Sequence, residues 1–259
     1  MWPTRRRPRI GRRRAACRLW WRPSTSRTAW TGESEGGGGG GAARGRPLAP
    51  PHPSHPVPSS AAVAAAAIFR LPLTSNEPDA VLFEPEGGVF DASTLPPYTA
   101  GALYFRESPL LLPLLARLQA SHLPPSCVLV DGAGAGHAAR CGAAVGLGAA
   151  AGLPTVGVAK SLLRVEGEVP SEREARAAGG EGVLEWRVGA LVAALRSNDG
   201  VRPVYVSAGH RVPLEAASAL VRACFRGHRA PEPARAADGA ARKRLRELLD
   251  ASGAAPGRH

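Results

Sequence analysis

The chain has 259 residues, of which 44% are hydrophobic but only 5% aromatic, so we expect a core built mainly from Ala, Val and Leu. Its formal net charge of +12 at pH 7 is unevenly distributed. Residues 1–46 hold twelve Arg and two Glu, which leaves 21 of the 33 basic and 19 of the 21 acidic side chains to the rest. The basic character therefore belongs to a tail, which argues against a broad electrostatic platform for nucleic acid on the folded part.

Four cysteines lie far apart without a CxxC pair, which argues against a zinc ribbon or a disulfide scaffold and fits a reducing compartment. No apolar run reaches the roughly 18–20 residues that a membrane-spanning helix needs. We therefore expect a monomer in the cytoplasm or nucleus, without membrane association. Targeting to an organelle by the Arg-rich N-terminus is the alternative.

Residues 1–60 are expected to form a disordered tail. Residues 5–14 are nearly continuous positive charge, residues 36–41 are all glycine, and residues 47–58 hold six prolines. Such a segment cannot bury enough apolar surface to offset the entropy lost on ordering. Its composition fits an organelle transit peptide, a tail for nucleic-acid binding or nuclear import, or translated GC-rich non-coding sequence.

Residues 61–250 are expected to fold as one domain in which strands and helices alternate. Strands are predicted at 63–73, 81–83, 127–130, 155–158 and 203–207, and helices at 110–119, 138–151, 213–225 and 242–249. Ser108 and Pro109 resemble an N-cap followed by proline at the first helical position. Residues 164–190 are predicted to be a polar excursion with edge strands. The alternation favours an α/β fold with crossover helices.

The most informative segment is 127–137, in which an apolar β-branched run ends in Asp131 and continues through small residues to His137. The run predicts a buried strand. A carboxylate at the end of a buried strand is costly to ionise without a partner, and strand ends of α/β sheets are where ligands bind. Asp131 is therefore a candidate metal ligand, and capping a helix or closing a turn is its alternative role.

Two more predicted strands end in a polar residue before a turn, at Lys160 and His210, and Glu107 precedes the helix that leads to Asp131. If these strand ends share one edge of the sheet, two carboxylates, an ammonium and an imidazole come together. Two carboxylates can hold Mg²⁺, while lysine and histidine can orient a water or stabilise phosphate charge. The set suits metal-dependent hydrolysis of a phosphodiester.

Each of these side chains also has a purely structural interpretation. His210 can form local hydrogen bonds at a helix N-terminus, and Glu107 can favour the start of the following helix. His137 can contact substrate or cap the next helix. Lys160 can be an ordinary surface residue, but it is one of only two lysines in an arginine-rich chain, which favours a specific need for an ammonium group.

Five segments resemble motifs of the endonuclease V family, which comprises inosine-directed nucleases with an RNase H-like fold. They read PYTAGALYFRE (97–107), VDGAGAGH (130–137), LPTVGVAK (153–160), RPVYVSAGHR (202–211) and PEPAR (231–235), the last followed by Asp238. They occur in the family's order with compatible spacing over roughly residues 61–245. The run 202–217 is more similar to the eukaryotic branch. The fold class implied is an RNase H-like mixed sheet flanked by helices.

The resemblance implies catalytic roles for four residues. Asp131 and Glu107 would hold Mg²⁺, with Mn²⁺ as an alternative, while His210 and Lys160 would assist the attacking water or the scissile phosphate. Members of the family cut the second phosphodiester on the 3′ side of inosine or deoxyinosine, leaving 3′-hydroxyl and 5′-phosphate ends. The partner implied is inosine-containing RNA or DNA, and the eukaryotic character favours single-stranded RNA.

The resemblance also implies how the damaged base is held. Residues 98–101 would form a wedge beside a flipped base, and the loop after Asp131 would line the hypoxanthine pocket, because glycine permits close approach. The substrate-binding residues implied are Tyr98, Gly101, Gly132, Gly134, Gly136 and His137.

The sequence departs from the family pattern at its N-terminal end. The family carries another aspartate in its first strand, but no aspartate precedes Asp79 here, and residues 61–73 match the family's second strand. We therefore expect the first strand to be missing or replaced, and a Mg²⁺ site short of negative charge. Ala100 and Ala133 also replace residues usual in the family, proline and His or Asn respectively.

Three hypotheses follow from this departure. The protein is a working endonuclease, a catalytically impaired relative that binds inosine-containing nucleic acid, or an α/β domain whose basic tail binds nucleic acid non-specifically.

Overall fold

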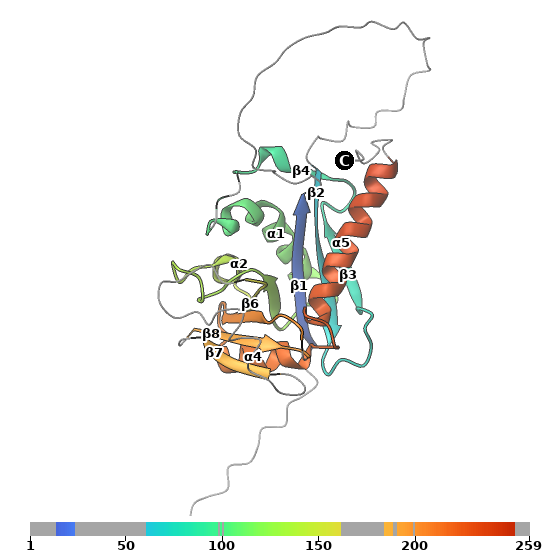
Figure 1. The fold of residues 1–259 in the computed structure, drawn as a ribbon. Coiled ribbons are helices and arrows are strands. Elements are labelled where there is room, and N and C mark those ends of the chain that lie inside the picture. The colour runs from blue at the N-terminus through green and yellow to red at the C-terminus, as the bar shows by residue number, and fades with distance from the viewer. Residues whose placement is uncertain are drawn as a thin grey trace, which may run out of the picture.

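A mixed β-sheet organises the part of the chain that the computed structural model describes, which is residues 14–23, 61–97, 99, 101–161, 184–188, 191–198 and 200–251 (Figure 1). The strands are β1 (Arg14–Pro23), β2 (Ala61–Arg70), β3 (Ala80–Glu84), β4 (Phe90–Asp91), β5 (Val128–Asp131), β6 (Thr155–Ala159), β7 (Leu184–Val188), β8 (Val192–Arg196) and β9 (Val204–Ala208). The helices are α1 (Leu103–Ala120), α2 (Ala143–Ala151), α4 (Leu214–Ala223) and α5 (Glu232–Ala251). A 3₁₀ turn covers Ala92–Thr94.

The strands lie in the order β3-β2-β1-β5-β6-β9-β8-β7, with β4 also paired to β2. Strands β1, β5 and β6 are parallel to one another, and every other neighbouring pair is antiparallel. The predicted strands at 63–73, 81–83, 127–130, 155–158 and 203–207 are confirmed within a few residues. The edge strand expected within 164–190 is β7, and residues 162–183 lie outside the described part.

Strand β1 corrects the expectation that the whole of residues 1–60 lacks structure. It lies between β2 and β5 and pairs with both, so the first strand is replaced by a segment of the Arg-rich tail. Buried strands need hydrogen-bond partners for their backbone groups, and this position in the sheet would otherwise leave two of them unpaired. The expectation of disorder rests on the average composition of residues 1–60. Within that segment, a short run contains Leu19, Trp20 and Trp21, and aromatic residues favour strands.

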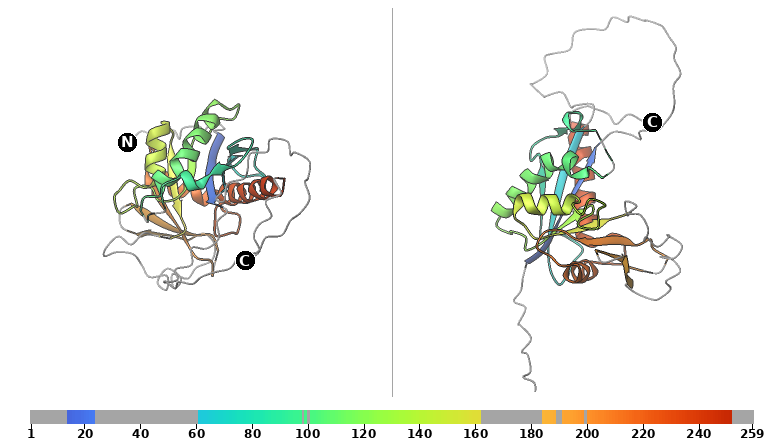
Figure 2. Two further views of the ribbon diagram at one scale, coloured as in Figure 1. Left: turned by 90° about the horizontal axis from the view of Figure 1, so that it is seen from above. Right: turned by 90° about the vertical axis from the view of Figure 1, so that its left-hand side faces the viewer.

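Helices cover both faces of the sheet (Figure 2). The face under α1 and α2 buries leucines of α1 against alternate residues of β2 and β5. The opposite face packs α4 and α5 against the other alternate residues of β2, β5, β6 and β9. Strand β2 contributes six alanines that are completely buried, which confirms the small-residue core expected from composition.

The helices differ from prediction mainly at their ends. Helix α1 begins at Leu103 instead of near Leu110, so Ser108 is not its N-cap, and Pro109 and Pro113 lie inside it. Proline removes backbone hydrogen bonds, but the five core leucines of α1 compensate by packing on the sheet. Helix α2 begins five residues later than predicted, and α5 begins ten residues earlier.

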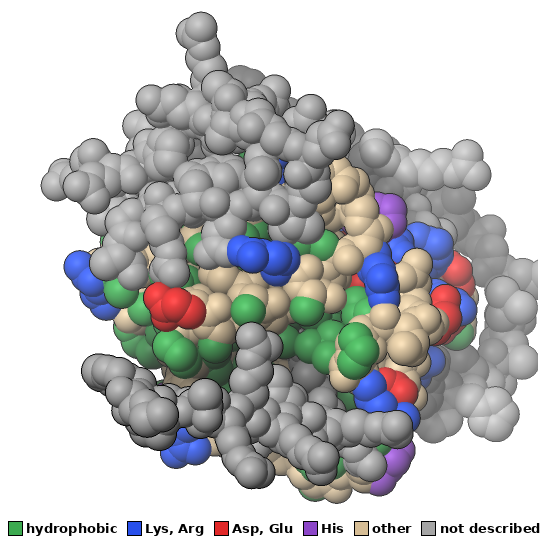
Figure 3. Space-filling model, turned by 90° about the horizontal axis from the view of Figure 1, so that it is seen from below, with side chains coloured by type: hydrophobic (Ala, Val, Ile, Leu, Met, Phe, Trp, Pro, Cys, Tyr) green, Lys and Arg blue, Asp and Glu red, His purple; other side chains and the backbone are tan. Residues whose placement is uncertain are grey.

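Charge is dispersed on the one face of the molecule that Figure 3 shows. On the face shown in Figure 3, Lys and Arg side chains are interspersed with acidic and uncharged ones where the described residues are visible. This agrees with the near-neutral balance of residues 47–259. No helix among the described residues is long and apolar enough to cross a membrane.

Candidate active site

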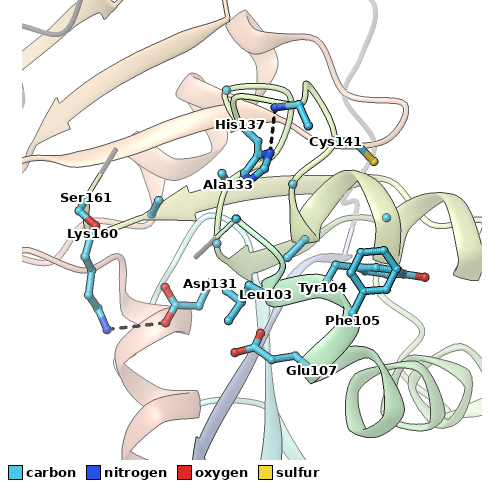
Figure 4. Close-up of a pocket in the computed structure, with 18 residues that line it drawn as sticks. Leu103, Tyr104, Phe105, Glu107, Asp131, Ala133, His137, Cys141, Lys160 and Ser161 are labelled. Atoms are coloured by element: carbon cyan, nitrogen blue, oxygen red, sulfur yellow. Dashed lines mark hydrogen bonds and ion pairs between the residues drawn. The ribbon is translucent and has the colours of Figure 1, made fainter. Parts of the chain in front are cut away.

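A pocket of about 580 Å³ lies where the N-terminal end of α1 meets the C-terminal ends of β5 and β6 (Figure 4). Strands β5 and β6 are parallel, so Asp131, which ends β5, and Lys160, which directly follows β6, lie at one edge of the sheet. The other walls are the first turns of α1 and the loop between β5 and α2. The sequence-predicted residues that line it are Gly101, Glu107, Asp131, Gly132, Gly136, His137 and Lys160.

Asp131 and Lys160 form the ionic centre of the pocket. The Lys160 ammonium Nζ lies 3.6 Å from Asp131 Oδ2, and the Asp131 side chain is 22% exposed. The pairing offsets part of the cost of placing a carboxylate at the end of a buried strand. Because the Lys160 side chain is 45% exposed, its ammonium remains accessible to an incoming anion.

Glu107 is the third ionisable group of the pocket and is almost fully buried, at 8% exposure. Burial first, and the negative charge of Asp131 second, raise its pKa from 4.5 to about 8, while Arg106 acts in the opposite direction. Two carboxyl groups therefore face the same pocket closely enough for one to repel the charge of the other. This arrangement favours a bound cation.

The donor set fits a divalent cation that is held in part by its substrate. Mg²⁺ commonly uses one or two carboxylates, several waters and substrate phosphate oxygens, and Glu107 with Asp131 supply the two carboxylates. Within the described residues no cluster of three His, Cys, Asp or Glu side chains comes together. Strand β1 contains no acidic residue, so the third carboxylate that the resemblance implies is not provided by that strand.

His210 does not join the other three predicted catalytic residues, and the expectation that all the strand ends share one edge is wrong for it. Strand β9 is antiparallel to β6, so its end lies beside the start of β6. There the backbones of His210 and Thr155 bond, with Thr155 N donating to His210 O at 2.9 Å. The His210 N–H donates to Thr155 Oγ1 at 2.8 Å. Asp131 pairs with Val158, which lies three residues beyond Thr155 along β6. At 3.3 Å per residue, about 10 Å of strand therefore separates the level of Asp131 from the contact between Thr155 and His210.

The glycine loop after Asp131 combines two functions. Gly132 and Gly136 line the pocket as predicted. Gly134 instead packs on β9, where its N–H donates to Ser207 Oγ at 2.8 Å and a Cβ would overlap the carbonyl oxygen of Ala208. Its lack of a side chain is therefore explained by packing of the loop against the sheet.

His137 closes the pocket on the side of Gly101. Its Nδ1 accepts a hydrogen bond from the Ala139 N–H at 3.1 Å, so the neutral imidazole carries its proton on Nε2. A Cβ at Gly101 would lie 3.3 Å from that Nε2, and Gly101 has a φ of +84°. Glycine there thus allows both the turn and the close approach of the ring. The predicted wedge residue Tyr98 lies outside the described residues.

A family model for endonuclease V matches residues 65–239, which is more than half of the chain. The chain belongs to the endonuclease V family. Endonuclease V of Azotobacter vinelandii is 46% identical over 149 residues, covering 57% of this chain and 64% of that protein. The Mus musculus endonuclease V is 42% identical over 170 residues (62% and 50%), and the Homo sapiens protein 41% over 167 residues (61% and 59%). The chain thus spans between half and two thirds of the length of these curated relatives.

Solved endonuclease V structures share the fold. The catalytic domain of human endonuclease V matches with a TM-score of 0.65 and 36% identity, over 73% of this chain and 78% of that one. Endonuclease V of Ciona intestinalis, in complex with a 24mer DNA containing an inosine followed by a ribo-adenosine, matches with a TM-score of 0.65 and 25% identity, over 91% and 87%. These matches confirm the α/β mixed-sheet fold expected from the sequence.

Two features of the endonuclease V pocket were not predicted. Arg229, from the loop before α5, donates from Nη2 to the carbonyl oxygen of Lys160 at 2.5 Å and to that of Pro203 at 3.1 Å. It therefore ties the end of β6 to the segment that enters β9. Tyr104 and Phe105, at the start of α1, line the pocket as an aromatic pair. The Arg229 contacts have no sequence signature, because they join segments far apart in the chain. Tyr104 and Phe105 are adjacent residues of the segment 97–107, but the sequence does not show that they line the pocket.

Proposed function

We propose that this endonuclease V family member is a metal-dependent endonuclease that cleaves the second phosphodiester on the 3′ side of inosine. Single-stranded RNA is the favoured substrate, and deoxyinosine in DNA is the alternative. The observation that carries the proposal is the meeting of Asp131, Glu107 and Lys160 in one pocket beside the glycine loop. The Ciona intestinalis relative crystallised with inosine-containing DNA supports the choice of ligand.

The charged groups of the pocket divide the chemistry between them. The Lys160 ammonium is placed to neutralise the charge that grows on phosphate oxygens in the transition state. Asp131 holds that ammonium in place and, with Glu107, offers oxygen ligands to Mg²⁺ or Mn²⁺. A divalent cation held there supplies further positive charge at the phosphate and activates water. Because Glu107 has a pKa of about 8 without a cation, binding one requires that it release its proton.

His137 offers a means of selecting inosine. Its Nε2–H donor faces the pocket beside Gly101, because Nδ1 is engaged by the Ala139 N–H. Hypoxanthine, like guanine, presents an oxygen acceptor at position 6, whereas adenine presents an amino donor there. A donor fixed in the pocket therefore favours hypoxanthine over adenine.

A cleavage assay tests the proposal. Purified protein is incubated with Mg²⁺ and single-stranded RNA or DNA that contains one inosine, and the products are mapped to the nucleotide. We expect a single cut at the second phosphodiester beyond inosine, no cut in the adenosine-containing control, and no product with Asp131→Asn. Equal cleavage of the inosine and adenosine strands would contradict the proposal.

A second candidate is a protein that binds inosine-containing nucleic acid without cutting it. It is favoured by the absence of acidic residues from β1 and of a third metal-ligating side chain among the described residues. Inosine-selective binding without products in the same assay would establish it. Binding that ignores inosine and collapses with added salt would instead support a non-specific binding protein.

A further inference from the structure

Among the residues whose side-chain burial the structure describes, Phe105 is the only large hydrophobic residue that is strongly exposed, at 65% of its full area. It lies in the first turn of α1, two residues before the pocket carboxyl group of Glu107. Because most of its side chain is exposed, Phe105 contributes little to the hydrophobic core. An exposed apolar side chain at the rim of a pocket that also holds charged groups is instead a feature of binding surfaces.

The ring of Phe105 lies against one neighbouring aromatic ring. It makes an edge-to-face contact with Tyr104, with ring centroids 5.4 Å apart and planes at 73°. Tyr104 in turn lies against α2 at Gly146, where a Cβ would come within 2.6 Å of the ring. The contact with Tyr104, which itself packs on α2, limits the positions that the Phe105 ring can take and so reduces the conformational entropy it loses on binding.

The aromatic pair and the phosphate-binding groups lie on different sides of the pocket. In Figure 4, Phe105 and Tyr104 stand away from the Lys160–Asp131 ion pair, with Glu107 and Leu103 between them. A strand whose phosphate lies at Lys160 and whose inosine enters the pocket therefore has an adjoining nucleotide that can reach this surface. Proteins that bind single strands commonly place an aromatic ring there, because every base has a π-face.

We propose that Phe105 is a stacking subsite for the unpaired base next to the inosine held in the pocket. This subsite rests on the proposed function, since it extends the site in which inosine is bound. It favours a single strand over a duplex, because a paired neighbour must first leave its own stack. Any of the four bases can stack, so the subsite adds affinity without sequence preference.

Double-mutant binding measurements test the subsite. Single-stranded RNA with one inosine is compared with versions that carry an abasic nucleotide immediately 5′ or 3′ of it, by fluorescence anisotropy in chelator so that no strand is cut. For the wild-type protein, removing the stacking base is expected to weaken binding by about 5- to 100-fold. Phe105→Ala should weaken binding of the intact strand by a similar factor. Its affinity for the abasic strand should be only slightly lower still, because the two changes remove the same contact.

Two variants serve as controls. Phe105→Trp keeps an aromatic surface and should retain both the affinity and the sensitivity to the abasic nucleotide. Leu112→Ala, on the same helix but outside the pocket, should leave that sensitivity unchanged. If the loss of affinity from Phe105→Ala simply adds to the loss from the abasic nucleotide, on both the 5′ and the 3′ side, the subsite is overturned while inosine-selective binding stands. Loss of all preference for inosine over adenosine in the wild-type protein would overturn the proposed function as well.

Discussion

The two ends of strand β6 carry polar residues for different reasons. At its C-terminal end, Lys160 reaches Asp131 at 3.6 Å across a solvent-accessible pocket. At its N-terminal end, Thr155 and His210 bond through backbone and hydroxyl groups beneath α2, where Thr155 Oγ1 also donates to the carbonyl oxygen of Ala144 at 2.6 Å. The first end leaves charges available for a ligand, whereas the second uses its polar atoms to close the fold.

A polar residue after a strand therefore indicates a site only when the direction of the strand is known. Strands β5 and β6 are parallel, so the residues that follow them meet. Strand β9 is antiparallel, so the residue that follows it lies at the other edge.

The largest expected effect concerns the charge of Glu107 at the pocket end. Its pKa is about 8 in the folded protein and 4.5 ordinarily, so between these pH values the folded state keeps a proton that the unfolded state has lost. Its contribution to stability is therefore complete below pH 4.5 and is lost as the pH rises to about 8. At about 1.4 kcal/mol per unit, the free energy of unfolding should fall by up to about 5 kcal/mol over this window.

Urea unfolding of the cation-free protein in chelator, across this pH range, measures the effect. Glu107→Gln cannot ionise and supplies the control, since its stability should exceed that of the wild type increasingly as the pH rises. Parallel pH profiles for the two proteins would mean that Glu107 is not held in a charge-disfavouring environment.

The next effect separates Lys160 from His210 by activity. Lys160→Ala removes the ammonium that faces Asp131 and should lower kcat by about 10²- to 10³-fold, as expected for losing one group that stabilises transition-state charge. His210→Ala leaves that pocket intact and should change kcat by less than about fivefold, close to the ordinary effect of a substitution outside the site. Single-turnover cleavage of an inosine-containing strand gives both values. Equal losses for the two variants would show that His210 acts in the same site.

Much of the fold was accessible from the sequence, because apolar runs such as 127–130 and 155–158 predict buried strands with little ambiguity. The pairing of Asp131 with Lys160 followed from two such runs that proved to be parallel. Strand direction itself has no local signal, which is why His210 was placed on the wrong edge. Likewise β1 was missed because its pairing depends on two distant strands, β2 and β5, that need backbone partners.

A smaller effect, on stability alone, is expected at the closed end of β6. A Cβ at Gly148 would overlap Thr155 Oγ1 and come within 2.5 Å of His210 Cβ. Gly148→Ala should therefore destabilise the fold by about 1–3 kcal/mol through overpacking. At roughly 2–4 °C per kcal/mol this lowers the Tm measured by thermal unfolding.

Gly239→Ala is the matched control on α5, since nothing lies within 4 Å of the added Cβ. Alanine is the better helix former, so this variant should unfold at the wild-type temperature or slightly above it. A Gly148→Ala protein as stable as Gly239→Ala would show that the end of β6 near His210 is loosely packed.

The smallest expected effect concerns how the pocket end is held. The Arg229 guanidinium donates from Nη2 to the carbonyl oxygen of Lys160 and from both Nε and Nη2 to that of Pro203, a two-nitrogen fork that a single ammonium cannot reproduce. Arg229→Lys should lower kcat by about three- to tenfold with little change in KM, because a small displacement of a positioned group costs rate rather than ground-state binding.

The same substitution in a Lys160→Ala background distinguishes positioning from general destabilisation. If Arg229 acts by holding Lys160, its effect on the single-turnover rate should disappear once that side chain is gone, whereas its effect on Tm should persist. A loss of rate that is the same in both backgrounds would show that Arg229 supports the fold as a whole. The position of the Lys160 ammonium, which faces Asp131, would then not depend on Arg229.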